Sequence, residues 1–357
     1  MKIAIILGTR PEIIKLSPII RECEKRNLDY FILHTGQHYS YNLDKLFFEE
    51  LNLPLPKYNL EIGSHTQGRQ LKLMIEKVKE KLIIEKPDII LVEGDTNTVL
   101  AGTLAGFELK IKIGHVEAGL RSYEIMAEEF NRILTDIYSD YCFAPTENSK
   151  ENLLKENIKE DKIFITGNTI VDAVYENIKI ADEKYNILKY LDLKKDNYIS
   201  VTCHRAECVD NKEKLNNILE GLKLVYDKFS IPIIFPMHPR TKNKINEFNL
   251  NISNNIKVIE PLGYLEFLQL MANSKLIITD SGGIQEESCI LKVPCVTIRE
   301  KTERPETLEV GSNMLVGYEP NKILELSELM INKEKNWINP FGDGKVSEKI
   351  IDIINKI

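Results

Sequence analysis

Short apolar runs alternate with longer amphipathic stretches along nearly the whole chain. The runs are four to six residues long, rich in Ile and Val, and contiguous, which is typical of parallel strands buried on both faces. The amphipathic stretches, such as 149–158 and 212–229, have apolar residues at helical spacing. This alternation predicts an α/β protein with parallel sheets. The predicted strands are 2–7, 30–34, 88–92, 112–116, 141–144, 162–166, 198–202, 231–235, 257–260, 275–279 and 294–298.

The alternation is interrupted once, near the middle of the chain. A polar stretch at 181–197 is followed by a new series of strands that begins at 198. We therefore expect two Rossmann-like, doubly wound domains that face a cleft, with the boundary near 168–197. Ligands of such sheets bind beyond the carboxyl ends of the strands. The residues directly after each predicted strand are therefore the candidates for chemistry.

Length and composition limit which partners we expect and in which cellular compartment we expect the protein. A length of 357 residues is too great for one ordinary core and suits two. The net charge is −7, so we expect no nucleic-acid partner, because such binding needs a basic surface. No apolar run approaches the ~20 residues of a membrane span, and the run before Gly8 is too short for a signal peptide. We therefore expect a cytoplasmic protein without a membrane partner.

The cysteines do not indicate a metal centre. The six cysteines form no CxxC pair and are expected to be reduced. Cys203, His204 and Cys208 lie close together in sequence, but their spacing fits no zinc pattern. We expect no metal site.

The first predicted strand leads into a candidate anion site. Gly8 permits a tight turn, and Pro11 suits the first turn of a helix. Arg10 and Lys15 are the nearest cations, and a helix N-terminus beside an arginine readily binds an anion. The alternative is an ordinary strand–helix turn with charges on the surface.

Three carboxylates follow strands at the same predicted end of the first sheet. Asp95 and Glu117 come after two neighbouring strands, and Glu128 lies on the next helix. Carboxylates that converge raise one another's pKa values, which is how acid/base groups are made. Two structural alternatives remain open: Asp95 as the N-cap of a helix, and Glu128 in an ion pair with Arg132 four residues on.

The second domain has cationic and glycine-rich turns after its strands. His204 and His238 each follow a strand and each have an arginine close by. In TDSGGIQEES (279–288), Gly282 and Gly283 let backbone amides approach an oxyanion at a helix N-terminus, and Ser281 adds a hydroxyl. This is a diphosphate cradle without a Walker or GxGxxG pattern. Carboxylates in one domain and anion contacts in the other suit a nucleotide sugar.

Ten short motifs, in order along the chain, identify a family that the sequence resembles. They are GTRPEIIKLSP (8–18), GDTN (94–97), HVEAGLR (115–121), EEFNR (128–132), PTE (145–147), GNTIVDA (167–173), HRAE (204–207), TDSGGIQEE (279–287), TERPE (302–306) and NPFGDGK (339–345). Through them the chain resembles the non-hydrolysing UDP-N-acetylglucosamine 2-epimerases over nearly its whole length. The resemblance implies a fold of the glycosyltransferase-B type, with domains 1–168 plus 343–357 and 169–342, and a last helix that crosses back to the first domain. It also implies a homodimer that uses a UDP-sugar substrate and no cofactor.

The resemblance assigns roles to individual residues. Asp95, Glu117 and Glu128 look like the acid/base carboxylates, and His204 looks like the group that faces the diphosphate; these four are the catalytic candidates. Phe267 would pack near the uracil and Glu287 would hold the ribose. The substrate-binding candidates are Arg10, Lys15, Arg132, His238, Phe267, Ser281, Gly282, Gly283, Glu287 and Arg304.

The chain departs from its relatives at a few positions. The segment before Glu128 is shorter than in many bacterial members, and Ala127 stands where those have proline. Glu93 stands where relatives usually carry His or Gln. Many bacterial members bind a second substrate molecule as activator, and this chain keeps only Gln37 and His38 of that region as candidate allosteric contacts.

The implied reaction is a reversible inversion at C2 of UDP-N-acetylglucosamine. The C2 hydrogen is not acidic, so UDP must leave C1 first to give 2-acetamidoglucal, and re-addition then gives UDP-N-acetylmannosamine. Four alternatives remain: a hydrolysing 2-epimerase, a 2-epimerase of a UDP-diacetamido uronic acid, a glycosyltransferase of the same fold, and a catalytically silent nucleotide-sugar sensor.

Overall fold

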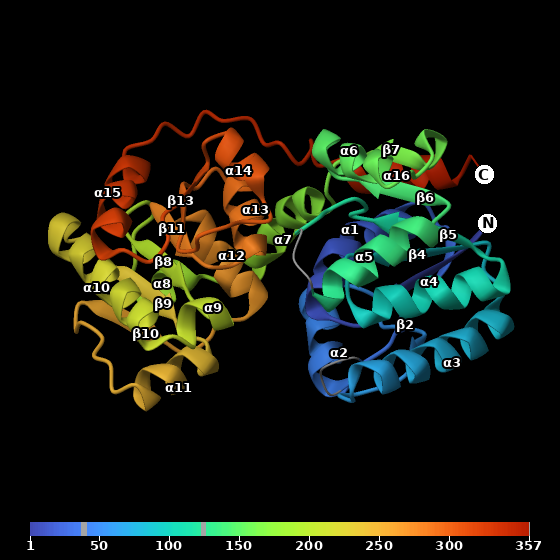
Figure 1. The fold of residues 1–357 in the computed structure, drawn as a ribbon, viewed down its shortest axis with the longest axis horizontal. Helices are drawn as coiled ribbons and strands as arrows, with labels where there is room; N and C mark the ends of the chain where they lie inside the picture. The colour runs from blue at the N-terminus through green and yellow to red at the C-terminus, as the bar shows by residue number, and fades with distance from the viewer. Residues whose placement is uncertain (37–40, 123–125, 357) are drawn as a thin grey trace. The chain divides into compact units, whose positions relative to one another are not determined.

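The computed structural model describes residues 1–36, 41–122 and 126–356 of the chain. The chain forms two compact units. The first unit is Met1–Glu176 with Phe341–Ile357, and the second is Asn177–Pro340. Each unit is built around one parallel sheet (Figure 1), which confirms the predicted α/β class with two Rossmann-like units.

The first unit has a parallel sheet in the order β3-β2-β1-β4-β5-β6-β7. Ala4 and Ile6 of β1 pack against apolar residues of α3 and α4, and these two helices lie side by side (Figure 1). The strands are β1 (Lys2–Leu7), β2 (Asp29–His34), β3 (Tyr58–Asn59), β4 (Ile89–Glu93), β5 (Lys112–Val116), β6 (Tyr141–Ala144) and β7 (Ile163–Ile165). The helices are α1 (Arg10–Lys25), α2 (Tyr41–Glu50), α3 (Gln67–Glu85), α4 (Asn97–Leu109), α5 (Ala127–Tyr138), α6 (Glu147–Lys155), η1 (Glu160–Lys162), α7 (Ile170–Lys184), which runs on into the second unit, and α16 (Val346–Ile354).

The second unit has the sheet order β10-β9-β8-β11-β12-β13, again with parallel pairs. Val201 of β8 and Ile278 of β11 share a core with Leu222 of α10. The strands are β8 (Ile199–Thr202), β9 (Ile233–Pro236), β10 (Ile256–Ile259), β11 (Leu276–Thr279), β12 (Cys295–Thr297) and β13 (Asn313–Leu315). The helices are α8 (Ile187–Leu191), α9 (Ala206–Val209), α10 (Lys212–Phe229), α11 (Pro239–Glu247), α12 (Tyr264–Ala272), α13 (Gly282–Ile290), α14 (Pro305–Glu309) and α15 (Pro320–Ile331).

The strand orders explain where a ligand can bind. In each sheet the chain starts at a central strand, builds outward to one side, and then returns to build the other side. The order therefore reverses between β1 and β4 in the first unit and between β8 and β11 in the second. The carboxyl ends of strands at such a switch point form the binding crevice of Rossmann-like sheets.

The end of the chain belongs to the first unit. Helix α16 packs against α1, as the resemblance implied for the last helix (Figure 1). Lys25 pairs with Glu348 at 3.1 Å, and Arg26 pairs with Asp352 at 2.5 Å. Backbone amides of Val346 and Ser347 donate to the buried Asp172, which caps the start of α16.

The structure also corrects the sequence-based elements. Strands β3 and β13 were not predicted, because two or three residues at a sheet edge give no apolar run. The polar stretch at 181–197 was given no predicted element, but α7 continues to Lys184 and α8 follows it. Ile187 and Leu191 of α8 are buried in a core with Tyr198, so apolar burial decides this segment despite its polar composition.

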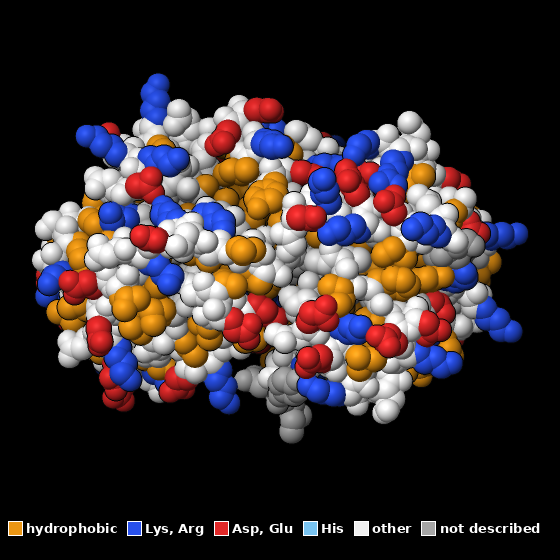
Figure 2. All heavy atoms as spheres, turned by 90° about the horizontal axis from the view of Figure 1, so that it is seen from above, with side chains coloured by type: hydrophobic (Ala, Val, Ile, Leu, Met, Phe, Trp, Pro, Cys, Tyr) orange, Lys and Arg blue, Asp and Glu red, His pale blue; other side chains and the backbone are white. Residues whose placement is uncertain are grey.

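The distribution of surface charge and the lengths of the helices bear on whether nucleic acid or a membrane is a partner. On the face shown in Figure 2, basic and acidic side chains are interspersed with apolar ones over both units. Within the described residues, no helix combines the length and the apolar character that crossing a membrane requires.

Candidate active site

Lys15 joins two buried carboxyl groups at the switch point of the first sheet. Its ammonium lies 2.5 Å from Oε2 of Glu117 and 3.1 Å from Oε1 of Glu93. Sheet register brings the carboxyl groups together, because Glu93 pairs with Val116 and Glu117 is the next residue. Asn168 donates a second hydrogen bond to Glu117, at 2.9 Å. Glu117 has φ of 69°, a left-handed conformation that is uncommon for glutamate and occurs often at functional sites.

Glu12 is a further buried carboxyl group near this cluster. It closes the capping box of α1 by accepting from the amides of Gly8 and Thr9 at 2.5 and 3.0 Å. It also accepts from the hydroxyl of Thr96. Burial raises the pKa of Glu12 to about 7, although these three hydrogen bonds act to lower it.

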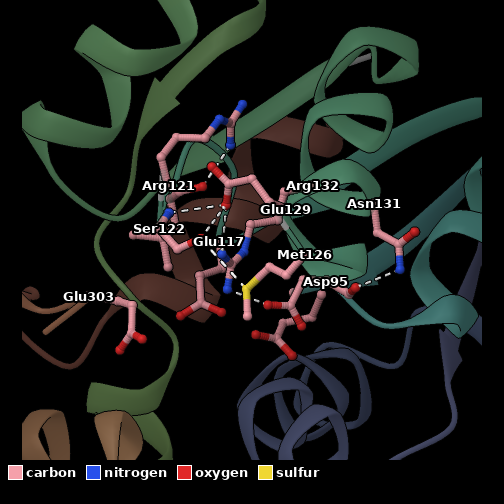
Figure 3. Close-up of polar contacts among 12 residues, drawn as sticks. Asp95, Glu117, Arg121, Ser122, Met126, Glu129, Asn131, Arg132 and Glu303 are labelled. Atoms are coloured by element: carbon pink, nitrogen blue, oxygen red, sulfur yellow. Dashed lines mark hydrogen bonds and ion pairs between the residues drawn. The ribbon is translucent and has the colours of Figure 1, made fainter. Parts of the chain in front are cut away.

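Arg132 connects the loop after β4 to helix α5. Its guanidinium binds the carboxylate of Asp95 and lies 3.0 Å from that of Glu129 (Figure 3). Glu129 also accepts from the amide and hydroxyl of Ser122, both at 3.0 Å. Burial raises the pKa of Glu129, but Ser122 and Arg132 outweigh it and hold the pKa below its usual value. Arg132 therefore pairs with Asp95 and Glu129 rather than with Glu128.

Glu128 has a different environment from its neighbour. Its side chain is exposed and lines a cavity of about 400 Å³ that Asp95 also lines. His65, Gln70 and Asn131 contribute polar groups to the same cavity. The structure therefore brings Asp95 and Glu128 to one cavity. It also places Glu117 beside Gly94, since a Cβ on Gly94 would lie 3.9 Å from Glu117 Oε2.

A buried network that the sequence analysis did not single out supports the loop of Asp95. His115 contacts the carbonyl of Gly94 through Nε2 at 2.9 Å and the carboxylate of Asp136 through Nδ1 at 2.7 Å. Arg121 donates to the other oxygen of Asp136 at 2.7 Å, and also to Glu156. A histidine inside an otherwise apolar strand was the available signal. Its partners could not be identified, because Asp136 is 21 residues away.

Asp280 organises the corresponding turn in the second unit. It is fully buried at the end of β11 and accepts from the backbone amides of His204 and Arg205 at 2.6 and 2.7 Å. This leaves the ring of His204 partly exposed. Arg205 and Arg299 both pair with Glu303, at 3.3 and 2.8 Å. Burial raises the pKa of Glu303, but the arginines outweigh it and hold the pKa at about 2.

The two predicted histidines and Phe267 meet at one cavity. The rings of His204 and His238 have centroids 5.4 Å apart, and both line a cavity of about 180 Å³ together with Phe267 and Ile284. His238 also caps α11, because its Nδ1 accepts from the amide of Arg240 at 3.1 Å. Burial, helped by His204 and Arg240, lowers the pKa of His238.

Gly282 and Gly283 are the first two residues of α13. Ser281 is the N-cap residue, and its hydroxyl makes no capping hydrogen bond. Gly282 and Gly283 do not need glycine for their backbone conformation, since neither has positive φ. A Cβ on Gly283 would meet no atom within 4 Å. A Cβ on Gly282 would lie 3.5 Å from Glu303 Oε2 and 3.6 Å from a guanidinium nitrogen of Arg205, so the side of the turn at Gly283 is open and the side at Gly282 faces charged groups.

The remaining predicted residues have defined partners or fall outside the described chain. Arg304 lies 2.7 Å from Glu286, and Glu287 is buried on α13. Arg10 lies over the ring of Phe47, with 5.4 Å to its centroid. Gln37 and His38 lie outside the described residues. No group of three or more His, Cys, Asp or Glu side chains that could hold a metal ion occurs within the described ranges.

Known proteins resemble this chain over its whole length. The family model for UDP-N-acetylglucosamine 2-epimerase matches residues 21–355. A UDP-N-acetylglucosamine 2-epimerase of Methanocaldococcus jannaschii is 57% identical, over 99% of each chain. The crystal structure of that organism's enzyme in complex with UDP-GlcNAc and UDP superposes with a TM-score of 0.89 over 100% of both chains. A UDP-2,3-diacetamido-2,3-dideoxy-D-glucuronate 2-epimerase of Pseudomonas aeruginosa is 37% identical, over 100% of each chain.

Proposed function

Since the chain belongs to the UDP-N-acetylglucosamine 2-epimerase family, we propose that it interconverts UDP-N-acetylglucosamine and UDP-N-acetylmannosamine. The observation that carries this proposal is the set of carboxyl groups at the switch point of the first sheet. Glu117 is held by Lys15 and Asn168, while Asp95 and Glu128 line one cavity. The chemistry at C2 needs acid/base groups held in this way.

The reaction begins with departure of UDP, because the C2 hydrogen has no neighbouring carbonyl to acidify it. As the C1–O bond breaks, its electron pair leaves with the diphosphate and the sugar becomes cation-like at C1. A carboxylate then removes the C2 proton, and the C2–H electrons form the C1–C2 double bond of 2-acetamidoglucal. Proton addition to the opposite face of C2 and return of UDP to C1 complete the inversion. Positioned acid/base groups contribute about 10²–10⁴-fold to such steps.

We assign the two halves of this task to the two units. Asp95, Glu117 and Glu128 are the acid/base groups, and Lys15, Arg10 and Arg132 contact the sugar side of the substrate. In the second unit, His204 and the amides of Ser281, Gly282 and Gly283 stabilise the departing diphosphate. Phe267 and His238 line the cavity that would take the uracil. Glu287 would accept from the ribose, and Arg304 would reach the substrate.

Proton exchange tests the reaction directly. The purified protein is incubated with UDP-N-acetylglucosamine in D₂O, without added metal or NAD, and followed by NMR. We expect UDP-N-acetylmannosamine with deuterium at C2, because the proton removed from C2 exchanges with solvent. Product that kept its C2 hydrogen would contradict elimination and re-addition.

The same spectra separate the alternatives. A hydrolysing enzyme would accumulate free N-acetylmannosamine and UDP, and a glycosyltransferase would leave the substrate unchanged until an acceptor is added. The Pseudomonas relative favours a second candidate, a UDP-diacetamido uronic acid as substrate. Parallel incubation with that sugar nucleotide decides between the two, since the true substrate shows the higher kcat/KM.

Gly283→Ala is expected to weaken UDP binding by about 10–100-fold without destabilising the protein. The new methyl group meets no protein atom, so the fold accepts it, but it adds bulk beside the α13 N-terminus, where we assign the diphosphate. Loss of one or two charge-assisted hydrogen bonds has an effect of this size. Calorimetric titration with UDP and the thermal midpoint measure the two effects. Gly68→Ala is the control, since its Cβ also meets no atom and it lies on α3 of the first unit, to which we do not assign UDP. Unchanged UDP affinity in Gly283→Ala would refute the cradle.

We also infer that the protein is a homodimer, as the family resemblance implies. Large apolar side chains are exposed on neighbouring helices of the first unit: Ile83 and Ile84 on α3, and Phe107 on α4. Sedimentation equilibrium tests the inference, and a monomer at all concentrations would contradict it.

A further inference from the structure

Glu93 is a buried carboxyl group to which the proposed reaction gives no role. It is the last residue of β4, and only 2% of its surface is exposed. The charged groups that face it come from two parts of the fold. Lys15 and Glu12 come from α1, and Glu117 comes from the turn after β5. Glu93 therefore shares its lysine partner with Glu117, the carboxylate that we assign to proton transfer.

The charges in this cluster do not balance if every group is ionised. Lys15 is one cation, and Glu93 and Glu117 would be two anions within 3.1 Å of it. Glu12 adds a third carboxyl group whose electrostatic influence reaches Glu93. An uncompensated buried charge is far costlier than a buried neutral acid, so two carboxyl groups that share the Lys15 ammonium favour a state in which one of them holds a proton.

Contacts indicate which group holds it. Glu117 accepts from Lys15 at 2.5 Å and from Asn168 at 2.9 Å, and both donors stabilise its ionised form. Glu93 lies farther from Lys15, at 3.1 Å, and that contact lacks the geometry of a hydrogen bond. Strand register places Glu93 beside Glu117, because Glu93 pairs with Val116 and Glu117 is the next residue. Burial, which outweighs Lys15, raises the pKa of Glu93 well above its usual value.

We propose that Glu93 is a positioning residue that stays protonated and donates a hydrogen bond to Glu117, so that Glu117 alone is the anion paired with Lys15. This inference rests on the proposed function of Glu117 as an acid/base group. The hydrogen bond fixes the orientation of the Glu117 carboxylate. Ionisation of Glu93 at alkaline pH would place a second anion beside Glu117 and compete for Lys15, and the rate would fall.

Two substitutions test the donor. Glu93→Gln keeps a donor toward Glu117 and cannot ionise, whereas Glu93→Leu keeps the volume and has no donor. We expect Glu93→Gln to lower kcat by less than about tenfold and Glu93→Leu by about 100-fold, both with KM near that of the wild type. The alkaline fall in kcat of the wild type should be absent in Glu93→Gln. Equal kcat in two folded variants, or an unchanged alkaline fall in Glu93→Gln, would overturn the proposal.

Infrared difference spectroscopy tests protonation without any turnover. At about pH 8, above the pKa of about 7 for Glu12, the wild type should show the C=O stretch of a protonated carboxyl group. Glu93→Gln should remove this band, and the matched control Glu12→Gln should leave it. A band that persists in Glu93→Gln, or that disappears only in Glu12→Gln, would overturn the proposal. If the wild type fails to epimerise in D₂O, the proposed function fails, but the band still reports on Glu93.

Discussion

Glu117→Gln is expected to reduce kcat by about 10²–10⁴-fold while UDP affinity stays unchanged. The amide has nearly the shape of the carboxylate, so the turn after β5 keeps its form, but it cannot take up a proton. It also removes the anion that Lys15 contacts at 2.5 Å. UDP is assigned to the second unit, so its binding does not depend on this group. Steady-state kinetics and calorimetric titration with UDP measure both quantities.

Comparison across the other carboxylates makes this prediction sharper. Asp95→Asn and Glu128→Gln should also lose most of their turnover and keep UDP affinity. Glu151→Gln is the control, since this glutamate is exposed on α6 and forms a surface pair with Lys155. Near-normal rates in all three site variants would show that these carboxylates only form caps and ion pairs.

Asp136→Asn is expected to lower the free energy of unfolding by about 3–5 kcal/mol. Asp136 is fully buried and accepts from His115 at 2.7 Å and from the buried Arg121 at 2.7 Å. Asparagine removes the negative charge and turns an amide toward one of these donors. Among the described residues, the Arg121 guanidinium then keeps Glu156 as its anionic partner. Chemical denaturation measures the loss.

The control for this prediction is an exposed aspartate. Asp161→Asn makes the same replacement of a carboxylate by an amide, but on the exposed surface of η1. The expected change in the free energy of unfolding is there within about 0.5 kcal/mol. Asp136→Asn should also lower kcat, because His115 holds the Gly94 carbonyl and thereby the loop of Asp95. An Asp136 variant as stable as that control would refute the role of the network.

Much of the fold follows from local pattern. The helix predicted at 212–229 is α10 with the same bounds, because its apolar positions recur at helical spacing over 18 residues. The central strands were found because burial on both faces demands contiguous apolar residues. Edge strands β3 and β13 were missed, since they are short and need no such run. Helix α8 was missed because tertiary burial of Ile187 and Leu191 outweighs its polar neighbourhood.

The candidate site likewise has residues that the sequence could identify and contacts that only the fold shows. Asp95, Glu117, His204 and Ser281 could be selected because each lies within two residues of the end of a strand, and that position can be read from the chain. Glu93 directly follows the predicted strand 88–92, but its partners Lys15 and Glu117 lie 78 and 24 residues away, and the local sequence gives no sign of them. The pairing of Arg132 with Asp95 rather than Glu128 also required the fold. Helix spacing offered only Glu128 as a partner, whereas Asp95 is 37 residues away in the chain and meets Arg132 only through the fold.

The sequence by itself therefore determined the α/β class, the two sheets and the strand ends at which chemistry can occur. These depend on periodicity and on residues adjacent in the chain. The tertiary structure alone decided which charges meet. Lys15 reaches Glu93 and Glu117 from positions 78 and 102 residues away, and His115 reaches Asp136 inside the protein. Those contacts follow from parallel strand register and helix packing, and their strength comes from burial, which no local pattern contains.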